Sequence, residues 1–363
     1  MRKSALGVLF SFLALAFLSP AAYSADASSS GHRTAKHKAQ AKKATPARTV
    51  KKRVVRKNVA KKSSSAKKKV ATRRAANKSN VRRVSYAPAP ARLTAGEIAG
   101  LHLTNDPLDL KSNVALVVDQ KTSDVLLEKN AAVALPIASI TKLMTGLVVV
   151  EAGLPMDEVL TVTNDDIDRE KFTGSRLRIG SQLTRADMLH IALMSSENRA
   201  ASALGRHYPG GLPAFVKAMN AKARALGMTS TRYVDPTGLS SGNVSSALDL
   251  AKLVVAAYEH PVIRRYSTDT AYVVEPGAGM LHYKNSNYLI KKSDWDIGLQ
   301  KTGYISEAGR CLVMQTMIEG RSVVMVFLDA KGKLSRAGDA SRVRRWIETT
   351  RPFVSTKLTA QQG

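Results

Sequence analysis

The sequence predicts an α/β (α+β) fold in which one antiparallel sheet, built from strands near both ends of the folded part, is covered by helices. Two sets of strand patterns lead to this expectation. A hairpin pattern occupies residues 113–119 and 124–129, and three apolar runs occupy residues 298–305, 311–318 and 322–329. Helix-like spacing dominates between the two sets, so we expect a helical subdomain beside the sheet and a cleft between them.

The first 25 residues have the pattern of a secretory signal peptide. Met1-Arg2-Lys3 precedes an apolar stretch at 5–18, and small residues follow at 21–25. The apolar stretch is short for a membrane span, so a signal cleaved after Ser24 or Ala25 is favoured over a retained anchor. No other segment is apolar over a long enough run to span a bilayer, so we expect an exported protein.

The next segment, residues 26–92, is a strongly basic arm. Residues 27–95 contain no acidic residue, and residues 31–90 hold 21 of the chain's 56 Lys and Arg residues, or +21 of the formal net charge of +28. The arm has no helical apolar period and cannot bury enough apolar surface to offset its ordering entropy. We therefore expect it to be extended and disordered, with the fold beginning near Leu93.

The helices expected within the folded part, residues 93–350, follow from local patterns. Pro136 precedes an apolar run of helix length, and two further helical patterns lie inside a helical insert that we expect from about 157 to 278. These three patterns occupy residues 137–150, 186–194 and 199–204. A closing helix is expected near 340–349, followed by a short tail, 351–363, that leaves no room for a further C-terminal domain or anchor.

The strands carry two further signals. Residues 319–321 form a short hairpin loop between the last two strands. The single cysteine, Cys311, lies in a strand that we expect to be buried, so the thiol is expected to be structural and no intrachain disulfide is possible.

Ser139 and Lys142 form the first chemically informative pair. A serine hydroxyl needs a nearby base to become a nucleophile, and residues three apart share one helix face. Ser139 is expected in the first turn of the helix that follows Pro136, where free backbone N–H groups favour developing negative charge. Lys142 can serve as the base only if its pKa falls, which burial beside a second cation such as Lys301 would cause.

The segment Ser195-Ser-Glu-Asn198 forms a corner between two helical patterns. Such a corner can direct Ser196 and Asn198 into a cleft, while Glu197 is expected to point away from it. The alternative is a helix N-cap made by Ser or Asn, and the two interpretations are compatible.

The segment Lys301-Thr302-Gly303 opens the late strands and is expected along an edge strand. There Thr302 can hydrogen-bond a carboxylate and Gly303 allows close backbone approach. Each of the three segments is weak alone, but their order S-x-x-K, S-x-N, K-T-G supplies a nucleophile, a base, a proton shuttle and a cation.

Together with longer matching runs, these motifs resemble the serine D-Ala-D-Ala peptidase family, the low-molecular-mass penicillin-binding proteins. The runs span 136–145, 195–198, 235–239 and 301–309, within a similarity that extends over roughly 110–350. Residues 192–201 and 207–211 are most similar to the D-alanyl-D-alanine endopeptidase subgroup, penicillin-binding protein 7/8. The resemblance implies a β-lactamase/DD-peptidase-like fold and a periplasmic enzyme that remodels peptidoglycan without a cofactor or a metal.

The resemblance also implies a role for each matching residue. Ser139 would attack a D-alanyl carbonyl with Lys142 as general base, and Ser196, linked to Lys301, would pass the proton to the departing amine. Asn198 would orient Lys142 and the substrate amide. Thr302 would hold a substrate carboxylate, and the backbone N–H groups of Ser139 and of Tyr304, which follows Gly303, would form the oxyanion hole. Peptidoglycan peptides would be the substrates, and β-lactams would acylate Ser139.

Four other functions stay open at this point. A D-alanyl-D-alanine carboxypeptidase would share every motif. A class A β-lactamase would need a glutamate that activates the deacylating water, and residues 233–243 contain none. A zinc peptidase would need clustered ligands such as H-E-x-x-H, whereas the histidines are scattered. A non-catalytic protein that binds polyanions through the arm is the fourth, and the intact motif set argues against it.

The arm suggests a partner class of its own. Its charge predicts non-specific attraction to anionic envelope surfaces such as lipid headgroups, lipopolysaccharide or wall carboxylates. No specific nucleic acid is expected, because Tyr86 is the arm's only aromatic residue and export removes the chain from cytoplasmic DNA. The alternative is a linker that serves only for solubility.

Overall fold

The computed structural model describes residues 92–277 and 279–350. The expected signal peptide (1–25), the basic arm up to residue 91 and the C-terminal tail (351–363) lie outside the described residues.

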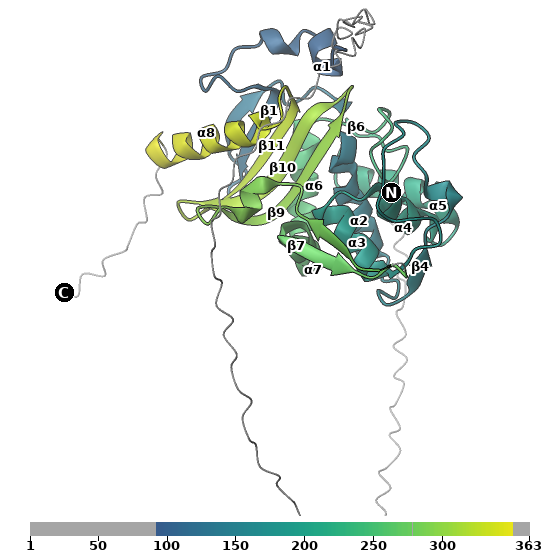
Figure 1. Ribbon diagram of the computed structural model, residues 1–363. Helices are drawn as coiled ribbons and strands as arrows, with labels where there is room; N and C mark the ends of the chain where they lie inside the picture. Colours follow the sequence, from purple (N-terminus) through teal and green to yellow (C-terminus); the bar gives the residue numbers. More distant parts are fainter. Residues whose placement is uncertain (1–91, 278, 351–363) are drawn as a thin grey trace, which may run out of the picture. The chain divides into compact units, whose positions relative to one another are not determined.

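A five-stranded antiparallel sheet forms the centre of the described part, in the order β2-β1-β11-β10-β9 (Figure 1). Its strands are β1 (Ser112–Asp119), β2 (Val125–Lys129), β9 (Asp296–Ile305), β10 (Gly309–Ile318) and β11 (Arg321–Ala330). β1 lies beside β11 with Leu116 opposite Val326, so the two ends of the fold meet in one sheet. This confirms the expected sheet, and β9 is at its edge, as the sequence predicts for Lys301.

Helices cover both faces of this sheet. One face packs against α8 (Ser335–Thr350) and the other against α6 (Ala247–Tyr258), so the sheet lies between them in Figure 1. Because both faces are buried, the inner strands read as continuous apolar runs rather than as alternating patterns. α8 begins five residues before the expected closing helix, because its first turn carries few apolar residues to reveal it.

The segment between β2 and β9 holds most of the other helices. They are α2 (Thr141–Glu151), α3 (Arg185–Met194), α4 (Asn198–Arg206), α5 (Gly211–Ala225) and α7 (Pro261–Thr268), with the short 3-10 helices η2 (Ala138–Ile140), η3 (Asn164–Asp166) and η4 (Tyr288–Lys291). The expected helical patterns at 186–194 and 199–204 are confirmed as α3 and α4.

The expected helical insert is not purely helical. It contains the strand pairs β4 (Val159–Thr161) with β5 (Gln182–Thr184) and β7 (Ala271–Val274) with β8 (Leu281–Lys284). A third pair, β3 (Leu135–Pro136) with β6 (Val244–Ser245), joins the start of the Ser139 region to a later loop. Strands of two to four residues are too short to show a period of two in the sequence.

The first described residues are fastened to the end of the sheet. Thr94 caps α1 (Ala95–Ile98) in a capping box with Glu97, and η1 (Leu101–Leu103) follows. The Thr94 hydroxyl also donates to the Asp329 carboxylate of β11 over 2.9 Å. Cys311 is buried within β10, as expected, and none of the described helices is long and apolar enough to cross a bilayer.

Candidate active site

Ser139 lies in the short turn that precedes α2, where its hydroxyl oxygen is 2.9 Å from the Lys142 amine. The sequence places Ser139 in the first turn of a helix. The structure has it one turn earlier, in the 3-10 helix η2, with α2 starting at Thr141. The serine and the lysine still face each other, because residues three apart are neighbours in a 3-10 turn as well as in an α-helix.

Two glycines hold this turn in place by allowing backbone to approach it. Ala138 adopts a left-handed φ of 48°, which is rare for a residue with a side chain. A Cβ on Gly238 would lie 1.9 Å from the Ala138 carbonyl oxygen, and one on Gly303 would lie 3.1 Å from the Ser139 nitrogen. Strand β9, which carries Lys301-Thr302-Gly303, and the loop that contains Gly238 therefore both contact the turn at Ser139. A side chain at either glycine would collide with this turn.

The Lys142 amine is buried and makes three polar contacts. It donates to Ser139 Oγ over 2.9 Å, to Asn198 Oδ1 over 2.7 Å and to the Thr237 carbonyl oxygen over 2.6 Å. Burial lowers the pKa of Lys142 to about 7, even though Asp235 and Glu197 act in the opposite direction. A lysine with this pKa is substantially neutral near neutral pH and can accept a proton.

Asn198 is oriented by a chain of hydrogen bonds from the loop before β5. Its amide nitrogen donates to Thr173 Oγ1 over 3.1 Å, and that hydroxyl donates in turn to Asp168 Oδ2 over 2.7 Å. Because the Thr173 hydroxyl donates its hydrogen bond to the Asp168 carboxylate, it can only accept a hydrogen bond from Asn198. The amide oxygen of Asn198 is thereby turned toward Lys142.

Ser196 and Lys301 form the second serine–lysine pair of the site. The Lys301 amine donates to Ser196 Oγ over 2.9 Å and to the Thr302 carbonyl oxygen over 2.8 Å. Ser196 has a left-handed φ of 65°, so the corner between α3 and α4 directs its side chain to β9. Of the four expected catalytic residues, Ser139 and Asn198 both contact Lys142, whereas Ser196 contacts Lys301.

Lys301 is the second buried lysine of the site, and its pKa is lowered as well. Burial, the charge of Lys142 and the charge of Arg336 hold the pKa of Lys301 well below its ordinary value of 10.5. Burial lowers the pKa of Lys142, as expected, and the repulsion between the two amines contributes to the lowered pKa of Lys301. Arg336, on α8, is a cation that the motif search misses, and its buried Nη1 makes no hydrogen bond within the described residues.

Glu197, the middle residue of the second motif, turns away from the two serine–lysine pairs. Its carboxylate accepts from Ser175 Oγ over 2.7 Å and from Tyr283 over 3.3 Å. It is also the N-cap of α4, accepting from the Arg199 backbone. The corner does contain a helix N-cap, as one interpretation of the sequence expected. The cap is Glu197, however, and not Ser196 or Asn198.

The remaining expected binding residues line edge strand β9. The Thr302 hydroxyl donates to Ser286 Oγ over 2.7 Å, which brings into the site a serine that no motif contains. The Tyr304 side chain is 56 % exposed and lies beneath the Arg310 guanidinium. β9 is the outermost strand of the sheet and passes next to Ser139, a position where an extended peptide can add on.

The loop from Asp235 to Asn243 supplies a contact that sequence reasoning did not assign. The Asp235 carboxylate accepts from the backbone of Thr237 and Gly238 over 2.6 and 2.7 Å, and the Pro236 carbonyl accepts from Thr145. These bonds fix the Thr237 carbonyl against Lys142. The run Asp235-Pro-Thr-Gly-Leu239 is visible in the sequence, but the contact uses a backbone oxygen, which every residue has.

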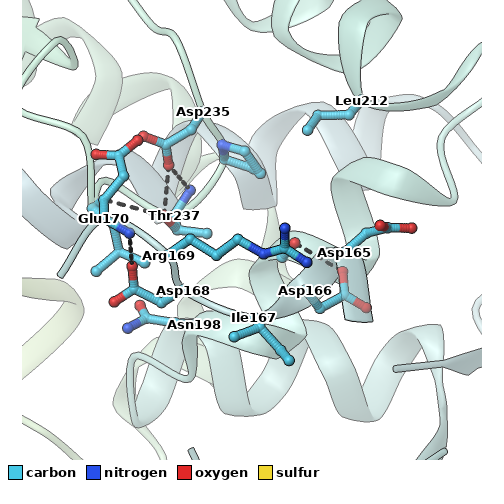
Figure 2. A pocket seen from close by; sticks show the side chains of 13 residues that line it. Asp165, Asp166, Ile167, Asp168, Arg169, Glu170, Asn198, Leu212, Asp235 and Thr237 are labelled. Carbon is cyan, nitrogen blue, oxygen red and sulfur yellow. Dashed lines mark hydrogen bonds between the residues drawn. The ribbon is translucent and has the colours of Figure 1, made fainter. Parts of the chain in front are cut away.

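Two pockets open on either side of Asn198. One, about 380 Å³, contains Thr237 and the acidic segment before Glu170, with the Arg169 side chain extended across it in Figure 2. The other, about 460 Å³, contains Ser196, Arg176 and Tyr283. Asn198 is the one residue that both pockets share.

No group of three or more His, Cys, Asp or Glu side chains is arranged to hold a metal ion within residues 92–277 and 279–350. The polar groups around Ser139 are instead two lysines, a serine, an asparagine and a threonine, which is a constellation for acyl transfer rather than for metal chemistry.

Comparison with known proteins assigns the family. A model of the D-alanyl-D-alanine carboxypeptidase family matches residues 102–332. The chain belongs to this family. It is accordingly a serine peptidase, a hydrolase of the penicillin-binding group, and the similarity includes all three motifs of the site.

Individual relatives agree with this family. A D-alanyl-D-alanine endopeptidase of Pseudomonas aeruginosa is 50 % identical over 269 residues, covering 73 % of this chain and 83 % of the relative. One from Escherichia coli K12 is 46 % identical over 269 residues, covering 73 % and 85 %. Penicillin-binding protein D2 of Listeria monocytogenes, solved in a cefotaxime-bound form, is 28 % identical with a TM-score of 0.60, covering 66 % of this chain and 98 % of that one.

Proposed function

We propose that this chain is a D-alanyl-D-alanine endopeptidase that cleaves D-alanyl–diaminopimelate cross-links of peptidoglycan through an acyl-enzyme on Ser139. The observation that carries the proposal is the buried Lys142 amine, which contacts Ser139, Asn198 and the Thr237 carbonyl at once. The endopeptidase names of the two relatives at 50 % and 46 % identity support the choice of bond.

The contacts of Lys142 explain how it would act as a base. The oxygens of Asn198 and Thr237 can only accept hydrogen bonds, so a neutral amine gives its two protons to them. Its lone pair then faces Ser139, whose hydroxyl donates to it. As Ser139 Oγ bonds to the D-alanyl carbonyl carbon, its proton passes to Lys142 Nζ.

The developing negative charge would be held by two backbone N–H groups, those of Ser139 and Tyr304. The approach of Gly303 to the Ser139 nitrogen, where a Cβ would stand 3.1 Å away, supports this arrangement. Losing one such donor typically raises the barrier by about 3–4 kcal/mol.

Breakdown of the tetrahedral intermediate breaks the bond between the carbonyl carbon and the amide nitrogen. The departing amine would receive its proton from Ser196 Oγ, and Ser196 would regain a proton from the Lys301 amine, which donates to it over 2.9 Å. Thr302 would hold the carboxylate next to that amine, with the positive charges of Lys301 and Arg336 nearby. Water then adds to the carbonyl carbon of the serine ester, and the bond between that carbon and Ser139 Oγ breaks. Lys142 returns its proton to Ser139 Oγ, the proton lost by water restores Lys301, and the carboxyl product leaves.

The domain division belongs to the same proposal. Residues 1–25 would be the signal peptide, 26–92 the basic arm, 93–350 the catalytic domain and 351–363 a tail. Export would place the enzyme in the periplasm, where its substrate lies, and the arm would hold it to anionic envelope surfaces.

The acyl-enzyme can be tested with a β-lactam, since the cefotaxime-bound relative supports the expectation that this site also reacts with one. Intact-protein mass spectrometry should show one penicilloyl adduct on the wild type and none on Ser139→Ala. An adduct that persists in Ser139→Ala would place the nucleophile elsewhere.

The choice of bond needs defined muropeptides. Purified enzyme should convert cross-linked dimers to monomers faster than it releases D-alanine from pentapeptide monomers. If the dimers stay intact while D-alanine is released, the chain is a carboxypeptidase, the function that the family's name describes.

A further inference from the structure

The pocket that contains Ser196 and Arg176 has no role in the acylation chemistry described above. It occupies about 460 Å³ and its wall comes from the loop before β5, from the α3–α4 corner and from β8. This volume is in the range of pockets that hold whole ligands, far beyond what the methyl side chain of a terminal D-alanine fills.

The position of this pocket relates it to the departing half of the substrate. Ser196 Oγ is the group proposed to protonate the leaving amine, so that amine lies against Ser196 when the bond breaks. A chain attached to the amine continues into the space that opens from Ser196. In a carboxypeptidase reaction that space stays empty, whereas in cross-link cleavage a whole peptide must pass through it.

Arg176 is a fixed cation at the rim of this pocket. Its guanidinium lies 3.8 Å from the centre of the Tyr283 ring and donates to the His282 carbonyl over 2.6 Å. Tyr283 is itself buried and bonded to Glu197, the cap of α4. No carboxylate lies within ion-pair distance of Arg176 among the described residues.

We infer that this pocket is the subsite for the acceptor peptide of the cross-link and that Arg176 pairs there with a carboxylate of that peptide. The inference rests on the proposed function and adds the specificity-determining residue. The chemical class is an acidic peptide, because the departing stem peptide ends in a free carboxylate. A guanidinium held over an aromatic ring, with one N–H group on the His282 carbonyl, keeps other N–H groups available for the two oxygens of such a group.

A substrate comparison tests the pairing. In Arg176→Gln, kcat/KM for cross-linked dimers should fall roughly tenfold, the loss of one charge-assisted pair, mainly through KM. Release of D-alanine from pentapeptide monomers and acylation by benzylpenicillin should change less than about twofold, because neither reaction has an acceptor peptide. Arg178→Gln, an equal change of charge two residues away and outside this pocket, is the matched control.

Changing the substrate separates pairing from a purely structural role of Arg176. A dimer in which the acceptor carboxylates are amidated, except the one next to the departing amine that Thr302 would hold, should lose roughly the same tenfold in kcat/KM with the wild type. It should lose nothing further with Arg176→Gln. Arg176→Lys should recover part of the rate, since it keeps the charge without the planar fork.

The outcomes distinguish this inference from the function on which it rests. Failure of the wild type to cleave dimers would overturn the proposed endopeptidase. Cleavage of dimers with an unchanged dimer-to-monomer preference in Arg176→Gln would overturn the acceptor subsite alone. Equal losses on dimers, monomers and benzylpenicillin would show that Arg176 only supports the fold of the site.

Discussion

At the scale of single residues, the fold uses burial to make a base out of Lys142. A lysine in water keeps its proton until well above neutral pH, but here the residue is 1 % exposed and its amine has no carboxylate in direct contact. Its three contacts are two carbonyl oxygens and a hydroxyl, none of which carries a charge. Asp235 and Glu197 therefore offset only part of the cost of desolvating the ammonium, and the pKa falls.

The lowered pKa of Lys142 predicts the pH dependence of acylation. The amine accepts a proton only when neutral, so the rate of acylation by benzylpenicillin should rise about tenfold per pH unit below pH 7 and level off above about pH 7. Stopped-flow measurement between pH 5 and 9 checks this. Lys142→Arg, which keeps a cation that cannot deprotonate, should be inactive throughout. A flat profile across this range would assign the base to another group.

At the scale of elements, the site is assembled where two separate segments contact the turn that carries Ser139. The two segments are the Gly303 part of β9 and the Gly238 loop, and β3, which leads into the turn, pairs with β6 after that loop. Each contact is backbone against backbone. The geometry of the nucleophile is therefore set by strand and loop positions rather than by neighbouring side chains.

Gly238→Ala should therefore lower the acylation rate strongly, although it adds only one methyl group. The new Cβ would stand 1.9 Å from the Ala138 carbonyl oxygen, and the residue would keep an unfavourable φ of 79°. We expect acylation to fall by about two orders of magnitude or more, as a displacement of about 1 Å can cause. Gly153→Ala is the control, because it shares the positive φ but meets no atom within 4 Å.

Gly153→Ala should lower the unfolding free energy by about 1–2 kcal/mol, because alanine disfavours a positive φ, and it should leave the acylation rate unchanged. Chemical denaturation of both variants, measured alongside acylation rates, separates the two effects. Wild-type acylation in Gly238→Ala would mean that the turn does not depend on this loop.

The elements also show which parts of the site a sequence can reveal. Ser139, Lys142, Ser196, Asn198 and Lys301 are found through side chains at fixed spacings, and the edge position of β9 follows from strand patterns at both chain ends. The sequence does not reveal three other groups of the site, because they reach it through loop closure or from α8 across the sheet. These are the Thr237 carbonyl, Ser286 and Arg336. The sequence also does not reveal the role of Thr173 and Asp168, since their effect on Asn198 depends on the direction of two hydrogen bonds.

At the scale of the whole molecule, charge is divided very unevenly along the chain. Residues 31–90 carry +21 of the formal +28, although the site needs only a few cations. The arm lies outside the described residues, so its role rests on this charge alone. A polycation of this density attracts any polyanion and releases counterions on binding, which makes the affinity strongly dependent on salt.

Deleting residues 26–91 should separate attachment from catalysis. The truncated enzyme should acylate with benzylpenicillin at the wild-type rate, because every residue assigned to the site lies between 139 and 336. Its sedimentation with isolated envelopes should fall sharply at low salt, whereas the full-length protein should be released as salt is raised. A full-length variant with the arm's Lys and Arg residues changed to Gln is the matched control and should behave like the deletion. Equal sedimentation of all three proteins at low ionic strength would mean that the arm is only a spacer.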